Sequence, residues 1–500
     1  MKFWLEYGIG NLLLLLAVGL SAAVGTGTVY ASDGEIPEAG TKIETRGTET
    51  RGTETRGTET RGTETRGSAQ NAEFQTVTVP DDARTLGEAY AMTAEGGTIE
   101  IRAGIYEVNE PLTIGKNLTL RGLGEKPEDV LLAGREQNVL YVKAGLVRVQ
   151  NLSIRNEGGV RMIPNGPESK KEKKARLLFN ARHAAVRVAA DRGFFEKCVL
   201  GSSEGCCVLA YGEEVRLNFD ECVIEKSHIG IVLKNGVQSE FNACTFWSNS
   251  LIDLQLGEGG RGVLKNCLFS DSTTESLLLR DTGELEVRNC DFQRCSSGIG
   301  LTGKGSNAKI FDSRFTECGV GVKLLDRASA TLTQCRFERN KTAGLNAMQN
   351  SKVEVVFCIF QAQEIFGMLH SGGAKGKIRD CRFLQNQACG LYITKKGTQL
   401  QAEHCDFTDQ GEMGTVVSEN ARGTFRDCVF QRCGGTGLTA EAGAYALAAD
   451  CTMESNAAYG IAVIDGASGI FRENKLTGNG QDWFLRDEKK IQRTGNDPNE

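Results

Sequence analysis

A cysteine recurs every 22 to 24 residues through more than half of this 500-residue chain. The recurring position is occupied by Cys198, Cys222, Cys244, Cys267, Cys290, Cys335, Cys358, Cys381, Cys405, Cys428 and Cys451, with Ser313 and Asn474 in the same register. An apolar residue, most often phenylalanine, follows two positions later, as at Phe292 and Phe383. A constant period of this length is typical of a solenoid, in which one turn cannot bury its apolar face and stacks on its neighbours. The sequence therefore predicts one long stacked array.

Each turn contains short apolar pieces that alternate as β-strands do. In the turn around Cys381 these pieces are Lys377–Phe383 and Gly390–Ile393, and the second piece begins with glycine in many turns. Alternation with a period of two is a strand signature. Asn386 lies five residues after Cys381, and polar side chains stacked at this position can hydrogen-bond along the array. We therefore expect an all-β parallel β-helix with about 23 residues per turn.

A leucine-rich repeat is the alternative solenoid with a similar period. The stretch Leu285–Phe292 matches its apolar core pattern. The leucine expected eight positions before the cysteine is missing, because Thr282 stands there. The second half of each turn is also led by glycine and resembles a strand rather than a helix, so the β-helix is favoured.

The segment before the first cysteine predicts a helix followed by strands. Residues 85–92 have the apolar spacing of a helix that ends before Gly96 and Gly97. Strand patterns follow at residues 98–101, 112–114, 118–120 and 130–132. We expect the helix to cap the open end of the array, where the first turn would otherwise expose its core.

Several short sequences give the chain a resemblance to a known superfamily. They are Gly96–Ile99, Gly104–Tyr106, Asn117–Gly122 and the later Cys-x-Phe and Gly-Ile-x-Leu turns. With these, residues 76 to about 485 resemble the right-handed parallel β-helix proteins of the pectin-lyase-like superfamily. The resemblance implies a right-handed coil. It does not imply one activity, because the superfamily includes lyases, hydrolases, esterases, epimerases and binding modules.

The two ends of the chain differ in composition from the array. Residues 1–31 contain an apolar stretch from Leu12 to Val24 and small residues before Ser32, which predicts a cleaved signal peptide; an uncleaved anchor is the alternative. Residues 32–75 contain repeated Thr-Glu-Thr-Arg-Gly units, which predict a disordered linker. We assign residues 76–486 to the β-helix and residues 487–500 to a polar tail. The protein is expected to be secreted or held at the cell envelope, and to meet a membrane only through an uncleaved N-terminal segment.

Composition excludes some classes of function. The net charge is −6, so no basic field suggests nucleic acid as a partner. Four histidines make a multi-histidine metal site improbable, and we expect no bound metal and no cofactor. The seventeen cysteines do not predict a disulfide scaffold, because side chains in register point parallel to one another. They are expected to be small buried apolar groups.

The candidate ligand-binding residues lie at matching positions of consecutive turns. Stacked positions are about 4.8 Å apart, so Asp380, His404 and Asp427 should form one row. Arg314, Arg336 and Arg382 share a second position, interrupted by Ile359, and Asp406 follows Arg382. An outward arginine row suits carboxylate or sulfate groups along a polymer. The alternative is an ordinary solvated surface, since outward positions of any solenoid are polar. The basic run in the loop at residues 161–176 allows the same two interpretations.

The sequence thus predicts an exported protein that presents a rigid surface to a polysaccharide or another cell-surface polymer. We expect it to be non-catalytic, because the turns after residue 198 are uniformly short and supply no walls for a cleft. The alternative is a polysaccharide-active enzyme, most plausibly a lyase on acidic glycans. Only that alternative would require Ca²⁺, held by carboxylates against an acidic sugar. No catalytic residue is assigned.

Overall fold

The computed structural model describes residues 74–157, 184–189, 191–486 and 488–498. These residues all fall in one compact unit, formed by Gly67–Arg161 and Asn180–Glu500. The predicted signal peptide, the predicted linker up to residue 73 and the basic loop at residues 161–176 lie outside the described residues.

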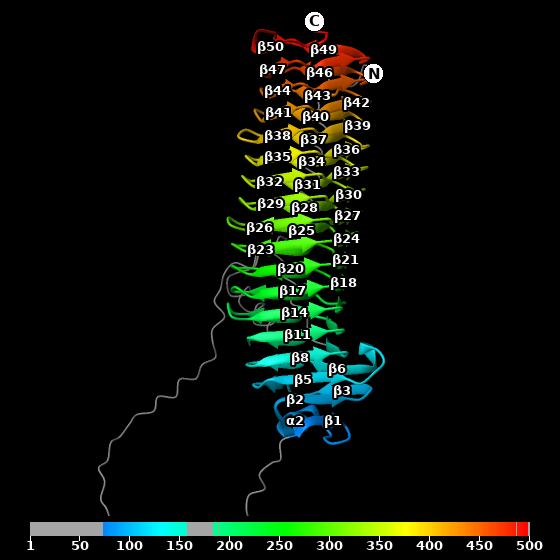
Figure 1. The fold of residues 1–500 in the computed structure, drawn as a ribbon, viewed down its shortest axis with the longest axis vertical. Helices are drawn as coiled ribbons and strands as arrows, with labels where there is room; N and C mark the ends of the chain where they lie inside the picture. Colours follow the sequence, from blue (N-terminus) through cyan, green and yellow to red (C-terminus); the bar gives the residue numbers. More distant parts are fainter. Residues whose placement is uncertain (1–73, 158–183, 190, 487, 499–500) are drawn as a thin grey trace, which may run out of the picture. The chain divides into compact units, whose positions relative to one another are not determined.

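Each coil contributes one strand to each of three parallel sheets, named A, B and C in chain order (Figure 1). In a representative coil these strands are β35 (Lys375–Arg379), β36 (Arg382–Leu384) and β37 (Cys389–Ile393). Sheet A contains 18 strands, and sheets B and C contain 16 each. The prediction of a parallel β-helix is confirmed. Because the glycine-led piece of each turn is a strand of sheet C, the leucine-rich repeat alternative is excluded.

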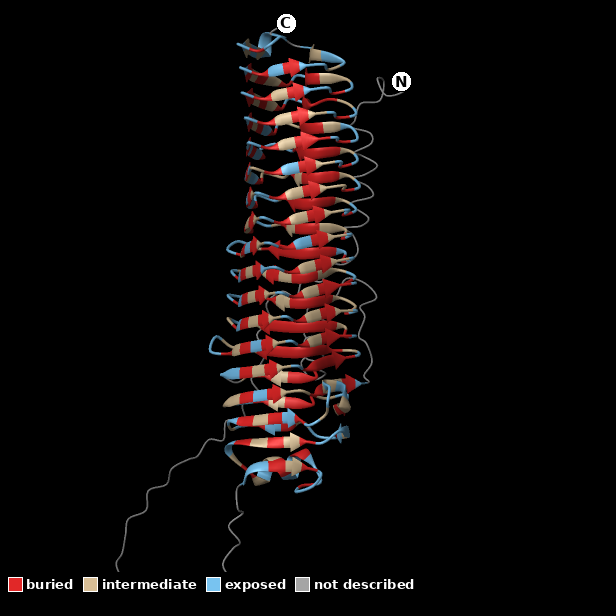
Figure 2. Cartoon of the chain, turned by 45° about the vertical axis from the view of Figure 1, so that its right-hand side comes forward, coloured by how far each residue is buried: buried red, intermediate tan, exposed pale blue. Residues whose placement is uncertain are grey.

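Phenylalanine side chains stack along the interior of the coils, where Figure 2 shows buried residues. From Phe246 to Phe430, neighbouring rings have centroids 4.5–4.9 Å apart and are nearly parallel. The glycine column of sheet C faces these rings. A Cβ atom added to Gly344 would lie 2.7 Å from Cδ1 of Phe360. Glycine therefore recurs in sheet C because a side chain there would overlap the ring stack.

All seventeen cysteines lie within the described residues, where they are buried and none forms a disulfide. The Cys381 thiol contacts the carbonyl oxygens of Val355 and Arg379, at 3.6 and 3.2 Å. Burial raises the pKa of thiols that have no close thiol neighbour in their own column; for Cys206 it reaches about 12. The prediction that the cysteines act as small buried apolar groups is confirmed.

A ladder of amide side chains lines the turn between sheets B and C. Gln410 Oε1 accepts hydrogen bonds from the backbone N–H and the side-chain amide of Asn386, at 3.1 and 2.9 Å. Two coils earlier, Gln363 Oε1 accepts the equivalent hydrogen bonds from the backbone N–H and the side-chain amide of Asn340. Each amide thus satisfies buried polar groups of the preceding coil, which explains the recurring Asn and Gln five residues after the cysteine.

The predicted N-terminal helix is present in the structure, whereas the C-terminal end of the stack extends beyond its predicted boundary. A short helix, α2 (Leu86–Met92), contacts strands β1 (Phe74–Val79) and β2 (Thr93–Ile101), and the Thr85 hydroxyl accepts a hydrogen bond from Glu88 N at 3.1 Å. At the other end, β50 (Ile491–Thr494) pairs with β47 (Ser468–Arg472), so the stack continues into the predicted polar tail. Asn496 Oδ1 accepts hydrogen bonds from the backbone N–H and the side-chain amide of Asn474, which continues the cysteine column into this last coil. No helix of the described part is long and apolar enough to cross a membrane.

Candidate functional site

Asp380, His404 and Asp427 are the first residues of the two-residue turns that join sheet A to sheet B in three consecutive coils. His404 lies between the two carboxylates, with Nδ1 3.7 Å from Asp380 Oδ1 and Nε2 3.7 Å from Asp427 Oδ2. The three residues have φ values of 54°, 50° and 50°, in the left-handed region. Asp and Asn tolerate this region better than most residues. The turn geometry therefore accounts for the aspartates in this row without a ligand.

The arginine column lies on the outer face of sheet B. Arg314, at the start of β27 (Arg314–Thr316), is in register with Arg336 of β30 (Arg336–Glu338), and Ile359 separates these two from Arg382. Arg336 forms an ion pair with Glu338 and donates to Gln361 Oε1 at 3.0 Å.

Arg382 Nε lies 3.9 Å from Asp406 Oδ2, and Asp406 begins β39 (Asp406–Thr408). The Arg382 side chain is 58% exposed, so this pair contributes little to stability. Two of the three predicted arginines thus already have a carboxylate of the chain as neighbour. Within the described ranges, no group of three His, Cys, Asp or Glu side chains converges as the ligands of a metal ion would.

A groove on the outer face of sheet A was not predicted from the sequence. It has a volume of about 470 Å³ and crosses five consecutive strands: β26 (Asn307–Phe311), β29 (Ser329–Thr333), β32 (Lys352–Val356), β35 and β38 (Gln399–Glu403). The outward side chains of the first and third residues of each strand form its two walls. The second residue points into the core, so its backbone forms the floor of the groove. The groove therefore runs across the strands, along the direction in which the coils stack. Its walls are formed by Asn307, Ser329, Thr331, Lys352, Glu354, Lys375, Lys377, Gln399 and Gln401.

The groove owes its depth to short side chains and its charge to lysines. Ser329 and Thr331 leave space in one coil, while Lys352, Lys375 and Lys377 stand in the next two. None of these lysines forms an ion pair with a described carboxylate. By contrast, Lys265 Nζ on the same sheet lies 2.7 Å from Glu240 Oε1. A smaller hollow that shares Asn307 continues the groove toward β23 (Glu284–Arg288). The sequence signal that would have found the groove is the run of small and lysine residues at these alternate positions.

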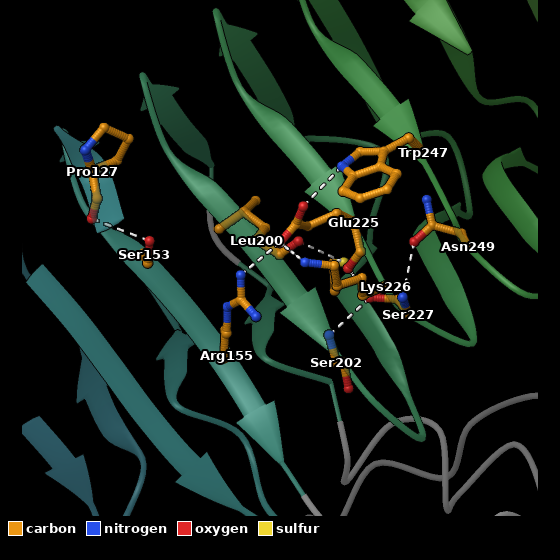
Figure 3. A network of polar contacts seen from close by, with 11 residues as sticks. Pro127, Ser153, Arg155, Leu200, Ser202, Glu225, Lys226, Ser227, Trp247 and Asn249 are labelled. Carbon is orange, nitrogen blue, oxygen red and sulfur yellow. Dashed lines mark hydrogen bonds and ion pairs between the residues drawn. The ribbon is translucent and has the colours of Figure 1, made fainter. Parts of the chain in front are cut away.

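A second polar cluster, on sheet B, is internally satisfied (Figure 3). The Glu225 carboxylate accepts hydrogen bonds from Arg155 Nη2 at 2.5 Å and from Trp247 Nε1 at 2.8 Å. Lys226 lies over the Trp247 ring, 5.1 Å from its centroid. Trp247, three residues after Cys244, could from its sequence position be either an exposed sugar-stacking platform or a packed turn residue. Its partners show that the ring is packed against its own chain.

The comparisons with known proteins concern the fold. No curated protein matches the chain. Similar solved structures include the catalytic domain of GH87 alpha-1,3-glucanase in complex with nigerose, with 10% identity, 86% of this chain and 70% of that chain covered, and a TM-score of 0.39. Tailspike protein 3 of bacteriophage CBA120 has 12% identity, coverage of 82% and 58%, and a TM-score of 0.36. The PL6 family alginate lyase AlyGC has 9% identity, coverage of 84% and 99%, and a TM-score of 0.31.

The family itself is identified by a sequence model rather than by these structures. The model of the right-handed β-helix region matches residues 173–310, 257–407 and 373–496. These overlapping matches together span residues 173–496, which is more than half of the chain. The match covers the coils that contain the phenylalanine stack, the cysteine column and the sheet A groove. The chain therefore belongs to the right-handed β-helix family.

Proposed function

We propose that this protein binds a polysaccharide along the sheet A groove and does not cleave it. The observation that carries the proposal is the groove itself, which is linear and lies across five consecutive coils. With neighbouring strands about 4.8 Å apart, it offers a polymer a repeated set of contacts in one direction.

The side chains of the groove suit a hydroxylated and acidic polymer. Asn307, Gln399 and Gln401 offer amide donors and acceptors, and Ser329 and Thr331 offer hydroxyls. Lys352, Lys375 and Lys377 add positive charge without an ion-pair partner among the described residues. The combination favours a polysaccharide that has hydroxyl groups and some negative charge.

The chemistry of the groove favours binding over cleavage. A lyase needs a base and neutralising groups around one sugar ring. The groove contains a single carboxylate, Glu354, and the predicted row at Asp380, His404 and Asp427 lies at the corner of the coil, outside the groove lining. The candidate groups for catalysis and the groove for a polymer are thus separate.

A steric variant tests the proposal. Thr331→Trp should fill the groove and abolish retardation of the full-length protein in gels that contain polygalacturonate, alginate, dextran sulfate or dextran. Thr452→Trp, on the outer face of sheet B, is the matched control and should migrate as the unmodified protein does. Retardation that survives Thr331→Trp would refute the groove as the binding site. Unsaturated product released from polygalacturonate or alginate would refute the non-catalytic assignment.

We also propose that the protein is exported. The proposal rests on the apolar stretch from Leu12 to Val24 and the small residues that end at Ala31. The protein recovered from its native cells should begin at Ser32 when its N-terminus is sequenced. A mature chain that begins at Met1 in the cytosolic fraction would contradict export.

A further inference from the structure

Phe357 has an exposed aromatic side chain and a strained backbone conformation, and its side chain is not packed in the core. It occupies the turn position between sheets A and B, with φ at 56°, and its side chain is 56% exposed. A bulky residue in the left-handed region is unusual, and such strain often marks a functional position. In the described coils the other residues with positive φ at this position are Asn151, Lys197, Glu221, Ala243, Asn266, Asn289, Asp312, Gln334, Asp380, His404, Asp427, Asp450, Glu473 and Gly495. Among them, only Phe357 has a large apolar side chain.

The residues beside Phe357 extend its apolar character across the corner of the coil. Val356 ends β32, and Ile359 begins β33 (Ile359–Gln361); both are partly exposed. Val356, Phe357 and Ile359 together form what we call the apolar band. The adjacent coils have polar residues at the matching positions. Arg379 is in register with Val356, and Arg336 and Arg382 lie on either side of Ile359.

The apolar band therefore has a charged border. Arg336 and Arg382 have side chains that are 43% and 58% exposed, so their guanidinium groups are accessible to a ligand that lies on the band. An exposed aromatic ring with polar groups around it is the arrangement that holds an amphipathic ligand. A pyranose ring is such a ligand, because its axial C–H groups form an apolar face while its hydroxyl or acidic substituents project from the edge.

We propose that Phe357 is a sugar-stacking residue, and that the apolar band binds one pyranose ring of the polysaccharide outside the sheet A groove. The ring packs its C–H face on Phe357, and the substituents at its edge reach Arg336 and Arg382. The predicted arginine column thus acts at the border of this subsite. The inference rests on the proposed polysaccharide binding, and it adds a contact that the groove does not supply.

Phe357→Asn separates a binding role from a structural one. Asn is favoured in the left-handed region and occupies the same turn position at Asn266 and Asn289. The variant should therefore have a melting temperature equal to or above that of the unmodified protein. The test uses whichever of polygalacturonate, alginate, dextran sulfate and dextran retards the unmodified protein. The affinity of Phe357→Asn for that polymer should be about tenfold lower. Phe357→Tyr keeps the ring and should retain the affinity.

The control is Ile105→Asn, which removes another exposed apolar side chain far from the band and should leave retardation unchanged. Unchanged affinity in Phe357→Asn would refute the inference, as would a loss of affinity together with a lower melting temperature. If Thr331→Trp abolishes retardation and Phe357→Asn does not, the polysaccharide function stands and the stacking role is wrong. If none of the four polymers retards the unmodified protein, both proposals are wrong.

Discussion

At the scale of single residues, the phenylalanine rings of the interior stabilise the coils between Phe246 and Phe430. Phe383 is fully buried, and the centroid of its ring lies 4.8 Å from that of Phe360 and 4.7 Å from that of Phe407. The glycine column opposite leaves no other side chain to fill the space of a missing ring. A truncation there creates a cavity that rigid neighbouring coils cannot close.

Phe383→Ala should therefore lower the free energy of unfolding by about 3–5 kcal/mol. Urea denaturation followed by circular dichroism measures the change. Phe74→Ala removes a ring that is 47% exposed and serves as the control, with an expected loss below about 1 kcal/mol. A loss of similar size in both variants would contradict the role of the interior stack.

Asp253 is a fully buried carboxyl group in the interior column that glycine occupies in most coils. It accepts a hydrogen bond from Asn249 Nδ2 at 2.8 Å and another from the Ser272 hydroxyl. Burial raises its pKa from 3.8 to about 7. Burial also lowers the pKa of His370, from 6.5 to about 4.

These two shifts have opposite effects on stability. Between pH 4 and 7 the folded state keeps the Asp253 proton that the unfolded state has lost, so Asp253 makes the protein less stable as the pH rises. His370 is neutral in the folded state and protonated in the unfolded state between pH 4 and 6.5, so its effect is to increase stability over that range. The free energy of unfolding of the unmodified protein, minus that of an Asp253→Asn variant, should therefore fall by up to about 4 kcal/mol from pH 4 to 7.

Asp253→Asn tests this pH dependence. Because the variant lacks the opposing Asp253 effect, its free energy of unfolding should rise more from pH 4 to 6.5 than that of the unmodified protein. Urea denaturation at intervals between pH 4 and 8 gives both profiles. Parallel profiles would show that the Asp253 carboxyl does not hold its proton in the folded state.

At the scale of the strand and the turn, polar ladders hold adjacent coils in register. Gln410 supplies one acceptor oxygen to two donors of Asn386 and donates to the carbonyl oxygens of Phe383 and Thr408. Gln410→Ala leaves these buried groups without partners and should cost about 1–3 kcal/mol of unfolding free energy. Gln387→Ala, at an exposed neighbouring position, should be neutral in the same urea experiment. Equal stability of the two variants would contradict the ladder.

The repeat period made the columns predictable, because residues 22 to 24 apart must stack. The alignment of Asp380, His404 and Asp427 followed from that rule, as did the burial of the cysteines. The sheet A groove did not follow, since its depth depends on the lengths of side chains in two columns at once. The strain at Phe357 was equally hidden, because the sequence does not show which turn residue adopts a positive φ.

At the scale of the whole described stack, stability does not depend on covalent cross-links. None of the seventeen thiols forms a disulfide, and all are buried. A thiol reductant should leave the melting temperature unchanged. Iodoacetamide should label no cysteine of the folded protein and all seventeen in urea, as counted by mass spectrometry. Labelling without urea would show that the interior opens to solvent.

In every sheet a coil pairs only with the coil before it and the coil after it. A gene that gains or loses one complete repeat would therefore join two surfaces that already fit, and the remaining coils would keep their partners. The number of coils in this architecture can therefore change without altering the pairing within the stack. Related chains can be expected to reach ligands of different extent by adding whole repeats rather than by redesigning any one of them.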